Sequence, residues 1–159
     1  MIVDEVFTMN IGIKGSGTPA GCINYSEIYS KIWAVANSQD FWFHTGNIYY
    51  KLVDTTQLRA ALNEEKTLSW RDTSGLTYIP GFFDCTDYAK SLLGYLVKYF
   101  YPNSPCIGIT FIRKPAGNHN MLFFMDIKKD LFLLEPQADI WTPWTSGSGT
   151  LAGNGGVFM

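Results

Sequence analysis

The chain has 159 residues and a formal net charge of -2 at pH 7, and 47% of its residues are hydrophobic and 16% aromatic. This composition predicts a compact globular protein and excludes a disordered chain. No stretch is basic enough to give nucleic acid an electrostatic footprint, and no apolar run approaches the length of a membrane span. We therefore expect neither nucleic acid nor a membrane as a partner.

The cysteines and the first residues bear on the compartment. Cys22, Cys85 and Cys106 cannot all pair with one another, and they do not lie at the spacing of metal ligands. Reduced thiols are typical of proteins inside the cell. The segment Met1–Glu5 is acidic, whereas a signal peptide begins with basic residues. We therefore expect a cytoplasmic protein.

Helices and loops are predicted for the first half of the chain, about residues 1–101. The expected elements are an extended segment over 2–13, a helix from Asn24 or Ser26 to about Asn37, strands or buried loop over 41–53, a short helix over 57–66 and an aromatic loop over 70–83. Asn24 and Ser26 are candidate N-caps of the first helix, and Thr55 or Thr56 is the candidate cap of the second.

The longest helical pattern runs from about Asp84 to Tyr101, and Pro102 ends it. Asp84 is the candidate N-cap, and Asp87 then stands at the capping-box position. Cys85 falls on the first turn, where the helix dipole favours a thiolate over a thiol. This position suits a nucleophile.

The second half, about residues 105–145, is predicted to form antiparallel strands. The expected strands cover 106–113, 119–127 and 131–137, and a mobile Gly/Ser-rich tail follows. Helices followed by an antiparallel sheet give an α+β fold, with the central helix packed on the sheet. We expect residues 1–159 to form a single domain.

Three side chains from these elements form a candidate catalytic triad. Cys85 is the candidate nucleophile, His119 the base at the head of a strand, and Glu135 the group that orients the imidazole. If Lys128–Asp130 closes a three-residue hairpin loop, His119 lies opposite Asp139, and Glu135 lies about 13 Å along the strand. Asp139 is therefore the alternative orienting residue.

The motifs FDCTDYA, GNHNMLFF and LLEPQAD, which lie between about Tyr78 and Asp139, resemble the papain-like cysteine protease domain of the Marasmius oreades agglutinin and its relatives. The resemblance implies a papain-like fold, with Cys85, His119 and Glu135 as the triad. It also implies substrate or oxyanion contacts from Gln137 and Tyr78. The chemistry requires no cofactor and no metal ligand, and the resemblance allows calcium, although Thr86 stands where the family has an acidic residue.

Together these observations predict a cysteine hydrolase, namely a thiol protease that cleaves a peptide or protein substrate through a thioester. A transglutaminase or a cell-wall amidase would use the same triad. The alternative from another class is a non-catalytic binding or structural accessory protein with a relict papain-like fold. Cys22 with His44 is a rival pair without an evident orienting residue, and Cys106 is expected in the core. The sequence leaves the oligomeric state open.

Overall fold

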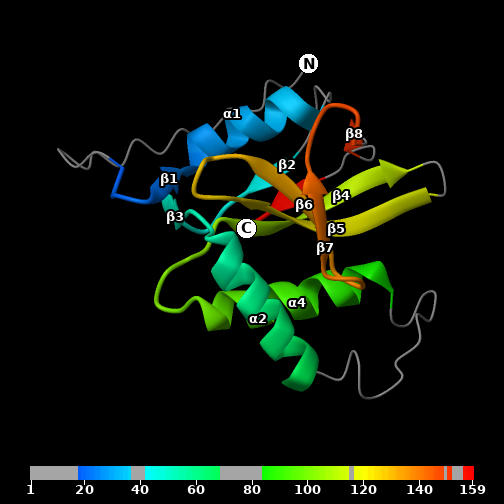
Figure 1. Cartoon of the computed structure of the whole chain (residues 1–159). Helices are drawn as coiled ribbons and strands as arrows, with labels where there is room; N and C mark the ends of the chain where they lie inside the picture. Colours follow the sequence, from blue (N-terminus) through cyan, green and yellow to red (C-terminus); the bar gives the residue numbers. More distant parts are fainter. Residues whose placement is uncertain (1–17, 37–41, 69–83, 115–116, 149, 152–155) are drawn as a thin grey trace.

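The computed structural model describes residues 18–36, 42–68, 84–114, 117–148, 150–151 and 156–159. The expected extended segment over 2–13 and the aromatic loop over 70–83 lie outside these ranges. The described elements form a mixed α/β fold in which a sheet lies between helices (Figure 1).

The first helix, α1 (Tyr25–Ala36), begins where the sequence predicts. Asn24 caps it, because the Asn24 side chain accepts a hydrogen bond from the Glu27 backbone N–H at 2.9 Å. Strand β1 (Cys22–Asn24) precedes α1 and pairs antiparallel with β3 (Tyr49–Lys51) in a small two-stranded sheet.

Two further helices lie on the other side of the large sheet. Helix α2 (Thr55–Leu68) is longer than the predicted 57–66, and its cap is Asp54 instead of a threonine. The Asp54 carboxylate accepts from the backbone N–H groups of Thr56 and Gln57, and a carboxylate also suits the positive end of the helix dipole. Helix α4 (Cys85–Tyr99) is the predicted central helix.

Among the described residues, the large sheet has seven strands, six of them in the order β2-β9-β4-β5-β6-β7. The strands are β2 (Trp42–His44), β4 (Ile107–Lys114), β5 (Gly117–Met125), β6 (Leu131–Glu135), β7 (Ile140–Pro143), β8 (Thr150–Leu151), which pairs with β4, and β9 (Gly156–Phe158). All of these pairs are antiparallel except β2 with β9, which is parallel. The predicted antiparallel sheet is therefore mixed.

The last described residues belong to the large sheet, and the predicted mobility of the Gly/Ser-rich tail stays a prediction. Strand β9 lies between β2 and β4, so a strand from the first third of the chain and the last described strand are neighbours in one sheet. A close approach makes this possible: a Cβ on Gly108 of β4 would lie 2.3 Å from the Phe158 carbonyl oxygen and 2.6 Å from the Phe123 ring. Only glycine leaves room for β9 at that distance.

The core has two layers, one on each face of the sheet. Helix α1 covers one face, and α2 and α4 cover the other (Figure 1). The α1 side contains Ile28 and Ile32 packed with sheet residues such as Phe123, whereas the α4 side contains Leu92 packed with Leu122. Side chains on β5 alternate between the two layers, as the pleat of a strand requires.

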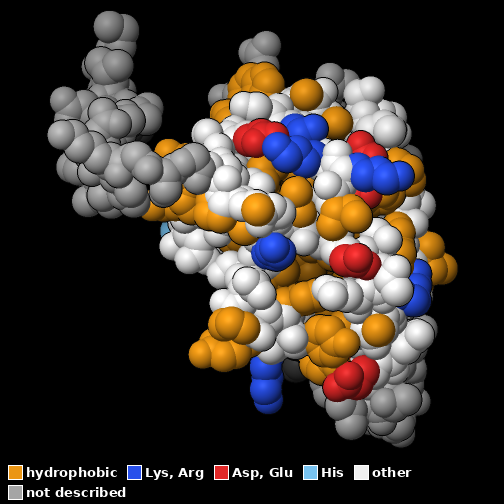
Figure 2. All heavy atoms as spheres, turned by 60° about the vertical axis from the view of Figure 1, so that its left-hand side comes forward, with side chains coloured by type: hydrophobic (Ala, Val, Ile, Leu, Met, Phe, Trp, Pro, Cys, Tyr) orange, Lys and Arg blue, Asp and Glu red, His pale blue; other side chains and the backbone are white. Residues whose placement is uncertain are grey.

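The surface carries charges of both signs. On the face turned forward in Figure 2, lysines and arginines are interspersed with acidic residues and with hydrophobic side chains. Within the described ranges, no helix is long and apolar enough to cross a bilayer.

Candidate functional site

The start of α4 is fixed by the capping box that the sequence predicts. The Asp84 carboxylate accepts from the Thr86 backbone N–H at 2.8 Å, and the Asp87 carboxylate accepts from the Asp84 backbone N–H at 3.1 Å. These two bonds satisfy N–H groups that a helix start leaves unpaired. They hold Cys85 on the first turn, where its side chain is 8% exposed.

The hydrogen-bond partner of Cys85 is Asn120. The Asn120 backbone N–H donates to Cys85 Sγ at 3.5 Å, and Asn120 Nδ2 lies 4.0 Å from the same sulfur. Asn120 Nδ2 also donates to Thr86 Oγ1 at 2.7 Å. None of the hydrogen bonds among the described residues joins Cys85 to His119.

Strand alternation accounts for this arrangement. Successive side chains on β5 point to opposite faces, so Asn120 shares a face with Leu122, which packs on α4. His119 shares the other face with Met121, which belongs to the layer under α1. Asn120 therefore meets the thiol. The sequence analysis missed Asn120, and its place beside His119 at the start of the strand is the signal that was present.

His119 and Glu135 form a close pair. His119 Nε2 lies 2.7 Å from Glu135 Oε2, and the two side chains are 20% and 24% exposed. Leu133 and Glu135 stand on the same face of β6, and Leu133 packs in the layer under α1 with Met121. The imidazole and the carboxylate therefore lie on the same side of the sheet.

The hairpin register differs from the one used in the sequence analysis. Met125 pairs with Leu131, so the loop spans Asp126–Asp130 and is longer than expected. The Asp126 carboxylate stabilises this loop, because it accepts from the backbone N–H groups of Lys128 and Asp130. The shift brings Glu135 closer to His119 along the ladder, within the diagonal reach of long side chains.

Asp139, the alternative orienting residue, lies elsewhere. It is 2% exposed, and its carbonyl oxygen accepts from Arg59 of α2 at 3.0 Å. Arg59 also lies over the Trp141 ring, with its guanidinium carbon 3.9 Å from the ring centroid. Glu135, and not Asp139, is thus the acidic residue that the structure brings to His119.

Of the two residues expected to contact a substrate, the structure describes only Gln137. Gln137 is exposed just beyond β6, and its backbone N–H donates to Glu135 Oε1 at 3.4 Å. Tyr78 lies outside the described residues, so its role stays a prediction. Calcium likewise stays a prediction: across the described ranges no group of three or more His, Cys, Asp or Glu side chains is arranged to hold a metal ion.

The other cysteines do not extend this site. Cys22 lies on β1 of the small sheet, whereas its rival partner His44 lies exposed on β2 of the large sheet. Cys106 is fully buried in the core, as predicted, and burial raises the pKa of its thiol to about 12. All three cysteines are free thiols.

Known proteins resemble this chain in structure. No protein-family model and no curated protein matches the sequence. Among solved structures, the fold is similar to that of PSL1a in complex with E64, with a TM-score of 0.71 and 16% identity. It is also similar to that of the Polyporus squamosus lectin bound to a human-type influenza-binding epitope, with a TM-score of 0.69 and 16% identity. Each match covers 87% of this chain and 50% of the other, so the chain spans half the length of these neighbours.

These neighbours correct the functional expectation. The resemblance to a fungal agglutinin holds at the level of the fold, which is as far as 16% identity reaches. The neighbours are lectins, and this finding contradicts the predictions of a cysteine hydrolase, of thiol protease activity and of a peptide substrate. The chain has a mixed α/β fold similar to that of a fungal lectin.

Proposed function

We propose that the chain is a non-catalytic binding domain on a relict papain-like fold, and that its ligand is a carbohydrate. The similarity to a lectin bound to a glycan epitope supports the ligand class. A fold does not by itself fix a function, and the chain spans half of that lectin, so the argument must come from the side chains of this chain.

The observation that carries the proposal is the His119–Glu135 pair. The bond of 2.7 Å holds the carboxylate in one orientation, and about a quarter of the Glu135 side chain stays open to solvent. A carboxylate has about four lone-pair sites, so Glu135 can accept from a sugar hydroxyl group in addition to its bonds with His119 and the Gln137 backbone N–H. Because the geometry is preformed, little ordering entropy is lost when a ligand binds.

The neighbours of this pair add complementary groups. Gln137 is exposed and its backbone N–H donates to Glu135, so its side-chain amide, which both donates and accepts, comes from a residue next to the carboxylate. Ile140 pairs with Glu135 across the β6–β7 ladder and is 61% exposed, so it offers an apolar contact for the C–H face of a sugar. We propose Glu135, His119 and Gln137 as ligand-contacting residues of this surface.

Cys85 has a structural role in this proposal. Cys85 is 8% exposed, and its sulfur accepts from the Asn120 backbone N–H, which links the start of α4 to β5. Replacement of Cys85 by alanine should therefore leave ligand binding unchanged.

The test is a glycan array probed with the labelled protein, followed by calorimetric titration of the glycan that binds best. Glu135→Gln should weaken binding 10-fold or more, because a hydrogen bond to a charged group is worth about 1.5–3 kcal/mol. Gln137→Ala should also weaken binding. Gln57→Ala is the matched control, since Gln57 is exposed on the first turn of α2, and it should bind like the wild type.

Two results would overturn the proposal. If no glycan on the array binds, or if Glu135→Gln and Gln137→Ala bind like Gln57→Ala, the carbohydrate surface is wrong. If the protein hydrolyses a peptide library and Cys85→Ala abolishes this hydrolysis, the non-catalytic assignment is wrong.

A further inference from the structure

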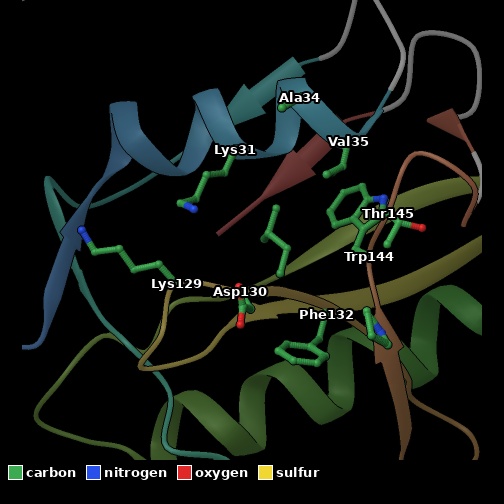
Figure 3. A pocket seen from close by; sticks show the side chains of 10 residues that line it. Lys31, Ala34, Val35, Lys129, Asp130, Phe132, Trp144 and Thr145 are labelled. Atoms are coloured by element: carbon green, nitrogen blue, oxygen red, sulfur yellow. The ribbon is translucent and has the colours of Figure 1, made fainter.

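A pocket of about 400 Å³ lies between α1 and the β6–β7 strands (Figure 3). Its volume falls within the range typical of small-molecule sites. It opens near Leu131, at the start of β6, whereas Glu135 ends that strand, about 13 Å further on. The pocket is therefore separate from the surface proposed for carbohydrate.

The inner wall of the pocket is apolar. Leu131 and Trp144 belong to the core layer under α1, where they are 8% and 3% exposed, and Val35 of α1 packs against the same layer. In Figure 3, Lys31 and Val35 project from α1 toward the strands, Trp144 lies next to Val35, and Lys31 lies further along the helix. An apolar group that enters here is shielded from water by side chains already held in place by the core.

The positive charge at the pocket comes from two lysines, Lys31 and Lys129, whose surroundings differ. Glu27 precedes Lys31 by one helical turn on α1, the spacing at which a glutamate usually pairs with a lysine. Here the Glu27 carboxylate instead accepts from Lys129 Nζ at 2.7 Å. No salt bridge within the described part of the chain joins Lys31 to a carboxylate, and the proposal below uses its ammonium group.

Asp130 limits how much negative charge the pocket accepts. Its carboxylate is exposed and lines the same pocket. With the Lys31 ammonium group and one acidic group nearby, the pocket suits a ligand with a single negative charge better than a phosphate, which carries more charge and is bound by several cations or N–H groups.

We propose that this pocket binds a small amphipathic monocarboxylate, with its carboxylate on Lys31 and its ring or branched chain against Val35, Leu131 and Trp144. This site is independent of the proposed function, because it shares no residue with the Glu135 surface. Loss of one activity therefore leaves the other measurable.

The test compares 3-phenylpropionate with its neutral counterpart 3-phenylpropionamide, by titration of the ¹⁵N-labelled protein followed by NMR. The chain has five tryptophans, and the indole N–H signal of Trp144 is assigned with Trp144→Phe. We expect the acid to shift the Trp144 signal and the backbone signals of Val35 and Leu131, and the amide to bind at least 10-fold more weakly.

Two lysine variants test whether Lys31 binds the carboxylate of the ligand. Lys31→Met should reduce the affinity for the acid to that for the amide and leave the amide unaffected. Lys90→Met is the matched control, because Lys90 is exposed on α4, on the other side of the sheet, and it should bind both compounds like the wild type. Equal affinity for the two compounds, an unchanged affinity in Lys31→Met, or no shift at Trp144 at millimolar concentrations would each overturn the proposal.

Discussion

Thr110 gives the sharpest test of the packing in this sheet. It lies in β4, between Val157 of β9 and Met121 of β5, and it is fully buried. Its hydroxyl oxygen has no hydrogen-bond partner among the described residues. A buried hydroxyl without a partner costs about 1–3 kcal/mol, because it has given up its hydrogen bonds to water.

Thr110→Val should therefore stabilise the protein. Valine keeps the branched shape that a strand favours and replaces the hydroxyl by a methyl group. Removal of the unpaired group should raise the free energy of unfolding by about 1–3 kcal/mol. For a chain of this length, each kcal/mol corresponds to roughly 2–4 °C in Tm.

Urea unfolding followed by circular dichroism measures the change, provided that the m-value stays constant. Thr110→Ser is the control, because it keeps the hydroxyl and loses the methyl group, and it should destabilise by about 1 kcal/mol. If Thr110→Val is less stable than the wild type, the hydroxyl makes a hydrogen bond in solution, for example to a buried water, and the reasoning is refuted.

Three further predictions concern the helix start, a buried thiol and two glycines. Asp84→Ala removes the acceptor for the Thr86 N–H and should lower the free energy of unfolding by about 1–2 kcal/mol. Asp84→Asn keeps an acceptor and should lower it clearly less. Equal decreases in stability in thermal melts would contradict the capping role. Burial raises the pKa of the Cys106 thiol from 9.0 to about 12. The folded state therefore holds the thiol proton more tightly than the unfolded state. The stability that this difference contributes is complete below pH 9 and is lost as the pH rises from about 9 to 12. Urea unfolding at pH 8 and pH 10 should therefore show a steeper loss for the wild type than for Cys106→Ala, and parallel losses would show that the thiol is not the cause. Gly108→Ala places a Cβ 2.3 Å from the Phe158 carbonyl oxygen and should destabilise the protein by several kcal/mol. Gly94→Ala on α4, where a Cβ meets nothing within 4 Å, should stabilise it by about 0.5–1 kcal/mol. If Gly108→Ala melts like the wild type, β9 is not held at this distance.

Short-range signals in the sequence predicted the helices well. The start of α4 depends on Asp84 and Asp87, which are neighbours in the chain, and both make the expected capping bonds. The start of α1 at Asn24 follows from the same chemistry. The cap of α2 was missed because Asp54, directly before the candidate threonines, is an equally good acceptor.

The sheet was less predictable, because its pairing depends on contacts distant in sequence. Strand β9 follows a Gly/Ser-rich segment and had no signal of its own in the sequence, and its partners β4 and β2 are far from it along the chain. The β5–β6 register depends on one side chain, that of Asp126, which holds a longer loop. A one-residue change in strand position reverses the face of every side chain, and the sequence analysis had no means to see that Asn120, and not His119, faces α4.

The candidate site shows the same limit. The sequence singled out Cys85, His119 and Glu135, and the structure brings His119 and Glu135 together while Cys85 bonds to Asn120. The pocket beside Lys31 had no sequence signal, because its lining comes from three separate segments that only the fold brings together.

The position of β9 has a consequence for the order in which the chain folds. Because β9 lies between β2 and β4, β2 cannot join the sheet before residues 156–158 have been synthesised and have docked. The helical segments and the β4–β5–β6 meander need only local contacts, so they are free to form first. We expect a slow final step in refolding, in which β9 enters beside β4 and the N-terminal half then closes onto it, since this step bears the entropy cost of the longest loop in the structure.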